Sequence, residues 1–124
     1  MICDDEPDVL RAYRFALRSN FEIQTTSSGR ECLKLYTELK EKGKRVDILL
    51  LDYRLGDMLG DEVACTIKGM NGTKIILISA FEIEPSFVHD LIKRNIIISF
   101  IKKPVHIGSL TALMESALNI TGTQ

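Results

Sequence analysis

A carboxylate at the end of a long apolar run is the first feature of this sequence that can do chemistry. Residues 48–51 are all Ile or Leu, and Asp52 follows them, ahead of a segment rich in Gly and Asp. A continuous apolar run predicts a strand that is buried on both faces, as in a parallel sheet. Because an unpaired buried charge is costly, Asp52 belongs at the end of this strand. Ligands bind at that end of the strands in open α/β sheets, so we expect Asp52 to be a functional residue.

Four other polar side chains stand where further strands are predicted to end. Asp4 and Asp5 follow the apolar first residues, Ser79 ends one apolar run and Lys103 follows another. In a parallel sheet these strand ends share one edge, so the side chains should converge with Asp52. Three neighbouring carboxylates need a counter-charge, which Mg²⁺ supplies through oxygen ligands. The lysine and the serine suit the remaining oxygens of a phosphoryl group, and the predicted reaction is attack of a carboxylate on a phosphoryl donor.

The rest of the chain predicts alternating strands and helices that place these residues. An α/β fold of five strand–helix units, (βα)5, follows, with a doubly wound parallel sheet and helices on both faces. The first strand is too short for a central one and is apparently truncated. The predicted strands are residues 1–3, 21–25, 46–51, 74–79 and 96–101; the predicted helices begin at Pro7, just after residues 26–29, at Asp61, at Pro85 and at Ile107, the third ending near residues 69–72, with a frayed end at residues 121–124.

Composition fits one globular domain and excludes several classes of protein. The chain has 124 residues, 45% of them hydrophobic and 27% charged. Lys and Arg number 16 against 17 Asp and Glu, so no basic bias indicates direct binding to nucleic acid or to an anionic membrane. The acidic start lacks the pattern of a secretory signal, and no apolar run approaches the roughly 20 residues of a membrane span. We expect a cytoplasmic location, with Cys3, Cys32 and Cys65 as buried free thiols.

Four motifs in a fixed order give this chain a family resemblance. Over its whole length, residues 1–124, it resembles the response-regulator receiver domain of two-component signalling. The resemblance implies the flavodoxin-like strand order 2-1-3-4-5. The motifs are Asp4-Asp5-Glu6-Pro7, Leu-Leu-Asp-x-x-Leu-x-Asp-x-x-Gly around Asp52, Ser79-Ala80 and Lys103-Pro104.

The resemblance also implies roles for the residues at the strand ends. Asp52 would accept the phosphoryl group, which Lys103 would pair with and Ser79 would hydrogen-bond. Mg²⁺ would be bound by Asp5, by Asp52 and by the backbone carbonyl of Arg54, with Asp4 acting through water.

Further expectations concern switching and partners. The Lys103–Pro104 bond would be cis, and Phe100 would be an aromatic switch residue that moves together with Ser79. A sensor histidine kinase would donate the phosphoryl group. An unidentified protein would dock on the surface formed by the fourth helix, the fifth strand and the fifth helix, and a homodimer is an open possibility.

Three positions depart from the family pattern. Gly56 stands where a proline is common, which would loosen the loop after Asp52. Arg54 and Phe81 flank the site, where a long cation and a bulky ring would hinder an incoming water, and we therefore expect slow self-dephosphorylation. Phe100 lacks the hydroxyl of a tyrosine, so its inward state would gain packing without a hydrogen bond.

Two other functions use the same residues. A Mg²⁺-dependent phosphohydrolase also forms an aspartyl phosphate, but such enzymes usually carry a second Asp two residues after the nucleophile, where this chain has Arg54. A receiver-like interaction module would need no phosphate, and the intact set of Asp5, Asp52, Ser79 and Lys103 argues against it. We therefore expect a phosphoacceptor switch and not an enzyme with turnover.

Overall fold

Strands and helices alternate along the part of the chain that the computed structural model describes, residues 1–68 and 72–119. Helices α1 and α4 each begin at a proline, as predicted, since the missing N–H of proline is no loss in a first turn. The strands are β1 (Ile2–Cys3), β2 (Thr25–Thr26), β3 (Ile48–Asp52), β4 (Lys74–Ser79) and β5 (Ser99–Lys102); the helices are α1 (Pro7–Leu17), α2 (Gly29–Glu41), α3 (Gly60–Lys68), α4 (Pro85–Lys93) and α5 (Ile107–Asn119).

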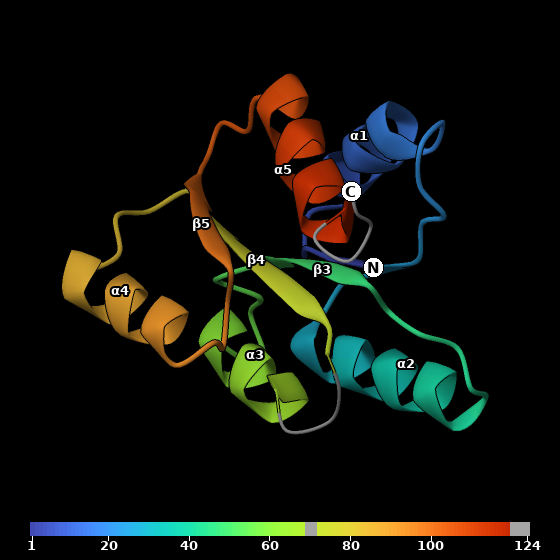
Figure 1. The fold of residues 1–124 in the computed structure, drawn as a ribbon, viewed down its shortest axis with the longest axis horizontal. Helices are drawn as coiled ribbons and strands as arrows, with labels where there is room; N and C mark the ends of the chain where they lie inside the picture. The colour runs from blue at the N-terminus through green and yellow to red at the C-terminus, as the bar shows by residue number, and fades with distance from the viewer. Residues whose placement is uncertain (69–71, 120–124) are drawn as a thin grey trace.

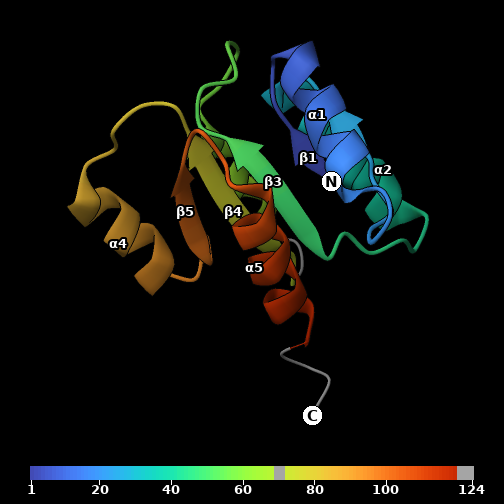
Figure 2. The same cartoon turned by 90° about the horizontal axis from the view of Figure 1, so that it is seen from above.

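The strands form one parallel sheet in the order β2-β1-β3-β4-β5, which confirms the predicted topology. Figure 1 shows β3, β4 and β5 side by side, and Figure 2 shows β1 beside β3. From β1 the chain moves outward to β2, then crosses over to β3 and continues in the other direction. The order therefore reverses between β1 and β3, and the crevice outside their carboxyl ends is the expected place for a ligand.

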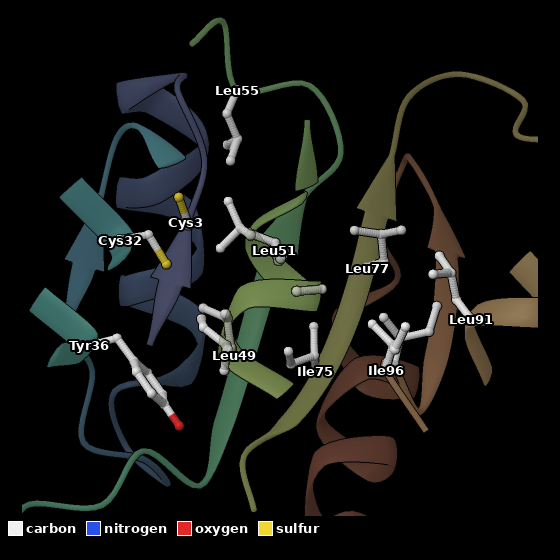
Figure 3. Close-up of a cluster of buried hydrophobic side chains, with 14 residues drawn as sticks. Cys3, Cys32, Tyr36, Leu49, Leu51, Leu55, Ile75, Leu77, Leu91 and Ile96 are labelled. Atoms are coloured by element: carbon white, nitrogen blue, oxygen red, sulfur yellow. The ribbon is translucent and has the colours of Figure 1, made fainter. Parts of the chain in front are cut away.

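Helices cover both faces of the sheet (Figures 1 and 2). Alternate residues of β3 and β4 point to opposite faces. Leu49 and Leu51 join a buried cluster with residues of α2, α3 and α4 (Figure 3), whereas Leu50 joins another with residues of α1 and α5. Because each strand buries both faces, the apolar runs of the sequence are continuous.

Only the strand predicted at residues 74–79 has the predicted bounds, and β1 is one residue shorter than the predicted residues 1–3. The strand predicted at residues 21–25 is reduced to β2, Thr25–Thr26, and the one predicted at residues 46–51 is β3, Ile48–Asp52. Both strands pair with β1, which has only two residues, Ile2–Cys3. The residues that precede β2 and β3 therefore have no β1 residue with which to form ladder hydrogen bonds. The strand predicted at residues 96–101 is β5, Ser99–Lys102, so the prediction was wrong for residues 96–98.

The chain between α4 and β5 explains that last difference. Asn95 has a left-handed backbone, with φ 60°, and the N–H of Ile96 donates to the carbonyl of Leu91 at 2.9 Å. The chain thus turns back on the end of α4, and β5 begins only at Ser99. Ile96 and Ile97 are buried nonetheless, which is why they read as a strand.

Smaller predictions had mixed outcomes. Cys3 and Cys32 are free and buried, but Cys65 is exposed on α3, so its predicted burial was wrong. The third helix begins at Gly60, one residue before Asp61. Its predicted end falls largely outside the described residues, as does the predicted frayed end at residues 121–124. No helix within the described ranges has the length and apolar character to cross a membrane.

We predict that Gly60→Ala destabilises the fold because Gly60 lies against the end of β3. A Cβ at this position would lie 2.6 Å from the backbone oxygen of Asp52, which no side-chain rotation can relieve. Urea unfolding should show a loss of about 2 kcal/mol in the free energy of unfolding.

The matched control is Gly72→Ala, where a Cβ meets no heavy atom within 4 Å. Equal effects of the two substitutions would mean that close packing at Gly60 does not constrain the end of β3.

Candidate functional site

The site is built around Asp52, the last residue of β3. Its side chain is almost buried, with 8% of the residue exposed. One carboxylate oxygen, Oδ1, lies 3.2 Å from the ammonium nitrogen of Lys103, which follows β5. The backbone holds Lys103 in place, since its N–H donates to the carbonyl of Ser79 at 2.8 Å. Residues from the ends of three neighbouring strands, β3, β4 and β5, thus meet at one edge of the sheet.

Asp4 completes this group of charges from the end of β1. It is only 1% exposed, and its two carboxylate oxygens have separate partners. Oδ1 accepts the N–H of Glu6 at 2.9 Å, and Oδ2 accepts the Lys103 ammonium at 3.0 Å. The carboxylate of Glu6 is 3.9 Å from the same ammonium. A single cation therefore stands among three carboxylates, and the local balance is negative.

This balance changes the acidity of the groups. Burial, together with the charge of Asp4, raises the pKa of Asp52 to about 6, although Lys103 opposes the shift. Burial alone would lower the pKa of Lys103, but the hydrogen bond to Asp4 and the charge of Asp52 outweigh it and raise that pKa. Lys103 therefore stays an ammonium, and Asp52 is a weaker acid than a carboxyl in water.

A cavity of about 230 Å³ opens above Asp52. Arg54 and Phe81 are both in its lining, with the guanidinium carbon 4.5 Å from the centre of the ring. A cation placed over an aromatic face is attracted to it, so the two side chains hold each other in the wall of the cavity. The cavity is lined by Asp5, Glu6, Asp52, Arg54, Ser79, Ala80, Phe81 and Lys103.

The carboxylates at the start of the chain offer ligands for a metal ion. One oxygen each from Asp4, Asp5 and Glu6 lie within 4.8 Å of one another. Hard oxygen donors of this kind fit Mg²⁺, so the residues present suit the ion that the sequence predicted. Asp52 is not in this trio, although it lines the same cavity as Asp5. Glu6 is a candidate that sequence reasoning missed, because its place in the cavity and its distance of 3.9 Å from Lys103 are visible only in space.

The remaining predicted residues are Ser79, the Lys103–Pro104 peptide bond and Phe100. Ser79 is 1% exposed, and its hydroxyl oxygen accepts the N–H of Phe81 at 3.0 Å. The Lys103–Pro104 bond is cis, as the resemblance implied. Phe100 is partly buried on β5 and packs against the cluster shared with α2, α3 and α4. It is therefore not part of the cavity itself.

The loop after Asp52 has fixed neighbours on both sides of Gly56. Gly56 has φ 83°, a conformation that suits glycine and that proline cannot adopt. Leu55 is buried to 3% exposure, and Asp57 is bound to α2. That Gly56 loosens the loop stays a prediction.

Asp57 is the second residue that sequence reasoning missed. Its two carboxylate oxygens accept the N–H groups of Gly29 at 2.9 Å and Arg30 at 3.0 Å, in the first turn of α2. These hydrogen bonds lower the pKa of Asp57. Free N–H groups at a helix start favour an anion, and Ser28 caps the same turn through the N–H of Glu31. The loop that carries the site is thereby fastened to a distant helix.

The fold and the site together define an α/β domain with an acidic pocket at the point where its strand order reverses. The sequence model of the response regulator receiver domain family matches residues 1–115. The chain therefore belongs to this family of signalling domains from two-component systems.

Solved structures of receiver domains share its fold. A response regulator receiver domain from Clostridium thermocellum is 22% identical, with a TM-score of 0.84 over 97% of this chain and 93% of that one. A receiver domain of a putative Luxo repressor protein from Vibrio parahaemolyticus is 19% identical, with a TM-score of 0.80 over 94% and 86%. The response regulator TrrA from Thermotoga maritima, in complex with Mg(2+)-BeF, is 26% identical, with a TM-score of 0.74 over 94% and 95%.

A curated relative is longer than this chain. The transcriptional regulatory protein KdpE of Mycobacterium tuberculosis is 32% identical over 81 residues, which is 64% of this chain and 34% of that protein. The match thus spans about a third of the length of the relative.

We predict that Lys103→Met lowers stability, because it leaves Asp4 and Asp52 buried without their cation. Breaking a buried ion pair costs about 3–5 kcal/mol, and the partial exposure of Lys103 reduces this to about 2 kcal/mol. Urea unfolding with a metal chelator measures the loss, and Asp4→Asn added to Lys103→Met should recover part of it.

Lys102→Met is the matched control, since Lys102 pairs with Glu82 on the surface. A loss no larger at Lys103 than at Lys102 would contradict a structural role for the buried ammonium.

Proposed function

We propose that Asp52 is a phosphoacceptor that takes a phosphoryl group from a sensor histidine kinase. A carboxylate oxygen of Asp52 attacks the phosphorus, the bond to the donor nitrogen breaks and the donor keeps its electron pair. The observation that carries the proposal is the meeting of Asp52, Asp4 and Lys103 at 3.0–3.2 Å, beside a cavity that also holds Asp5 and Ser79. Family membership supports it, because receiver domains exchange signals with a histidine kinase and an effector.

Three residues of the cavity have different roles in this reaction. Asp52, with a pKa of about 6, is mostly ionised at neutral pH and can act as the nucleophile. The Lys103 ammonium already lies 3.2 Å from its carboxylate and would neutralise charge on the phosphoryl oxygens. Ser79 lines the same cavity and can donate its hydroxyl hydrogen to a phosphoryl oxygen.

Mg²⁺ would be held by Asp5, by Asp52 and by the backbone carbonyl of Arg54, with Asp4 acting through water, and Glu6 is a further carboxylate donor in the same cluster. When bound, this ion supplies positive charge that offsets the crowded carboxylates and the phosphoryl oxygens. The complex of TrrA with Mg(2+)-BeF supports this assignment by likeness, since that protein shares 26% of its residues with this chain.

The output would be a change of surface rather than a product. The Ser79 hydroxyl oxygen accepts the N–H of Phe81 in this structure, so a movement of this hydroxyl toward a phosphoryl oxygen would act on the backbone at Phe81. The loop of Phe81 leads to α4, and Phe100 lies on the neighbouring β5. We assign the surface of α4, β5 and α5 to an effector protein, and phosphorylation would shift an existing equilibrium between two forms of it.

The test is incubation with acetyl phosphate and Mg²⁺, followed by intact mass measurement. We expect one added phosphoryl group on the chain, none on Asp52→Asn and none when a chelator removes the metal. Asp47→Asn is the matched control, since Asp47 pairs with Arg45 on the surface before β3, away from the cavity, and its loss should leave labelling intact.

Other outcomes identify the rival functions. Steady release of phosphate without accumulation on Asp52 would indicate a phosphohydrolase. An unchanged mass at every concentration of donor and metal would indicate an interaction module that needs no phosphate.

We predict that the phosphorylated form decays slowly because Arg54 and Phe81 hinder the incoming water. Removing both side chains with Arg54→Ala and Phe81→Ala should speed the decay about tenfold, equivalent to about 1.4 kcal/mol of activation free energy. Loss of the label over time, measured by intact mass, gives the rate.

A second stacked pair provides the matched control. Arg18 lies over the ring of Phe15 on α1 with a similar spacing, 4.7 Å. Arg18→Ala with Phe15→Ala should leave the decay unchanged. Decay within seconds in the unaltered chain, or no acceleration in the first double variant, would contradict the hindrance.

A further inference from the structure

Two cysteines lie against each other in the core, at the point where β1 meets α2. Cys3 is the last residue of β1, Cys32 lies one turn into α2, and both are free and fully buried. They belong to the same buried cluster, and Figure 3 shows Cys3 on β1 beside Cys32 on α2. The proposed phosphoacceptor reaction uses neither thiol.

One backbone oxygen fixes the position of both cysteines. The carbonyl of Ser28 accepts the N–H of Cys32 at 3.0 Å and the thiol of Cys3 at 3.3 Å. The side chain of Cys3 therefore lies under the first turn of α2, next to the backbone that carries Cys32. The two thiols are close enough to interact with each other as hydrogen-bonding groups.

A third sulfur lies beside the pair, which makes a soft metal ion the rival to a bond between the cysteines. The Sδ atom of Met1 is 3.8 Å from the Sγ atom of Cys32. A monovalent copper ion between two thiolates leaves a net negative charge, which would be buried next to the carboxylate of Asp4. A disulfide is neutral, so these surroundings favour a disulfide over a metal ion.

The first turn of α2 gives a small molecule a route to the thiols. Neither sulfur is reached from solvent while this turn is closed, but Arg30 and Glu31 on its outer side are exposed. The turn is held by two caps, from Ser28 and from Asp57. Helix ends open locally at a lower free energy than the whole fold, so exchange at Cys32 can proceed without global unfolding.

We propose that Cys3 and Cys32 are a redox pair that closes to a disulfide in the folded chain and joins β1 to α2. The co-reactant is a small-molecule disulfide. One cysteine, as a thiolate, attacks a sulfur of that molecule, whose S–S bond breaks and releases one small thiol that takes up a proton. The other cysteine then attacks the protein sulfur of the mixed disulfide and releases the second small thiol. Two protein thiols are oxidised and one small disulfide is reduced.

The new bond would join two segments that frame the candidate site. Cys3 is followed directly by Asp4, and Cys32 lies one turn after Gly29, whose N–H is held by Asp57. In the folded chain the bond links groups that are already neighbours, whereas in the unfolded chain it closes a loop. Oxidation should therefore stabilise the folded state. The inference does not depend on the proposed function.

The experiment brings the unaltered chain to equilibrium with reduced and oxidised glutathione and a metal chelator, once folded and once in concentrated urea. Peptide mapping after alkylation assigns each disulfide. Cys65 is the control within the same chain, because Cys32 is nearly as far from Cys65 as from Cys3 in the sequence. We expect both pairings in urea but only the pairing of Cys3 with Cys32 in the folded chain. Its equilibrium constant should be at least about tenfold larger than in urea.

Thermal unfolding gives a second readout of the same bond. In a chain with Cys65→Ser, which leaves one possible pair, a tenfold preference for the folded state should raise the Tm on oxidation by about 5 °C. Cys32→Ser added to Cys65→Ser is the matched control, and glutathione should leave its Tm unchanged.

Two results would overturn the proposal. One is an equilibrium constant in the folded chain no larger than in urea, which would mean that the fold holds the two sulfurs apart. The other comes from incubation with Cu⁺ in place of glutathione. Retention of one copper ion by the folded chain but not by Cys32→Ser, together with no disulfide under oxidised glutathione, would assign the sulfurs to a metal ion.

Discussion

The candidate site depends on the ion pairs that the Lys103 ammonium forms with Asp4 and Asp52. The ammonium lies 3.0 Å from Asp4 and 3.2 Å from Asp52, two carboxylates that the fold has almost removed from water. Without a cation, two neighbouring buried carboxylates cannot both stay ionised, and one would take up a proton. The lysine reduces that conflict without abolishing it, as the raised pKa of Asp52 indicates. The fold thus keeps a negative pocket that is ready for a further cation.

The parallel sheet makes this contact possible between residues that are far apart in the sequence. Asp4 and Lys103 are separated by 99 positions, yet both follow strands that end at the same edge. Continuous apolar strands fix that edge, because they bury both faces and leave charged groups only at their ends. Gly60 then lets α3 begin directly against the last backbone oxygen of β3. The apolar strands that form the core therefore also determine where the charged residues of the site lie.

Sequence reasoning identified the fold and most of the pocket, because both leave local marks. An apolar run that ends on Asp52, and a proline after Lys103, can be read without coordinates. Strand bounds are less visible, because pairing depends on neighbours, and the short β1 limits β2 and β3 whatever their own propensity. The contact of Glu6 with Lys103 and the capping by Asp57 depend on distance in space, so no spacing in the sequence indicated either.

The bond between Asp57 and the first turn of α2 has a consequence beyond local order. The loop of Asp57 begins immediately after Asp52, so a ligand that displaces this loop must also alter the capping of Gly29 and Arg30. By reciprocity, anything that stabilises or frays the start of α2 changes the free energy of the same loop. Proton exchange at the two capped amides would therefore record events at a carboxylate that neither amide touches. The helix then serves as a remote reporter of the pocket.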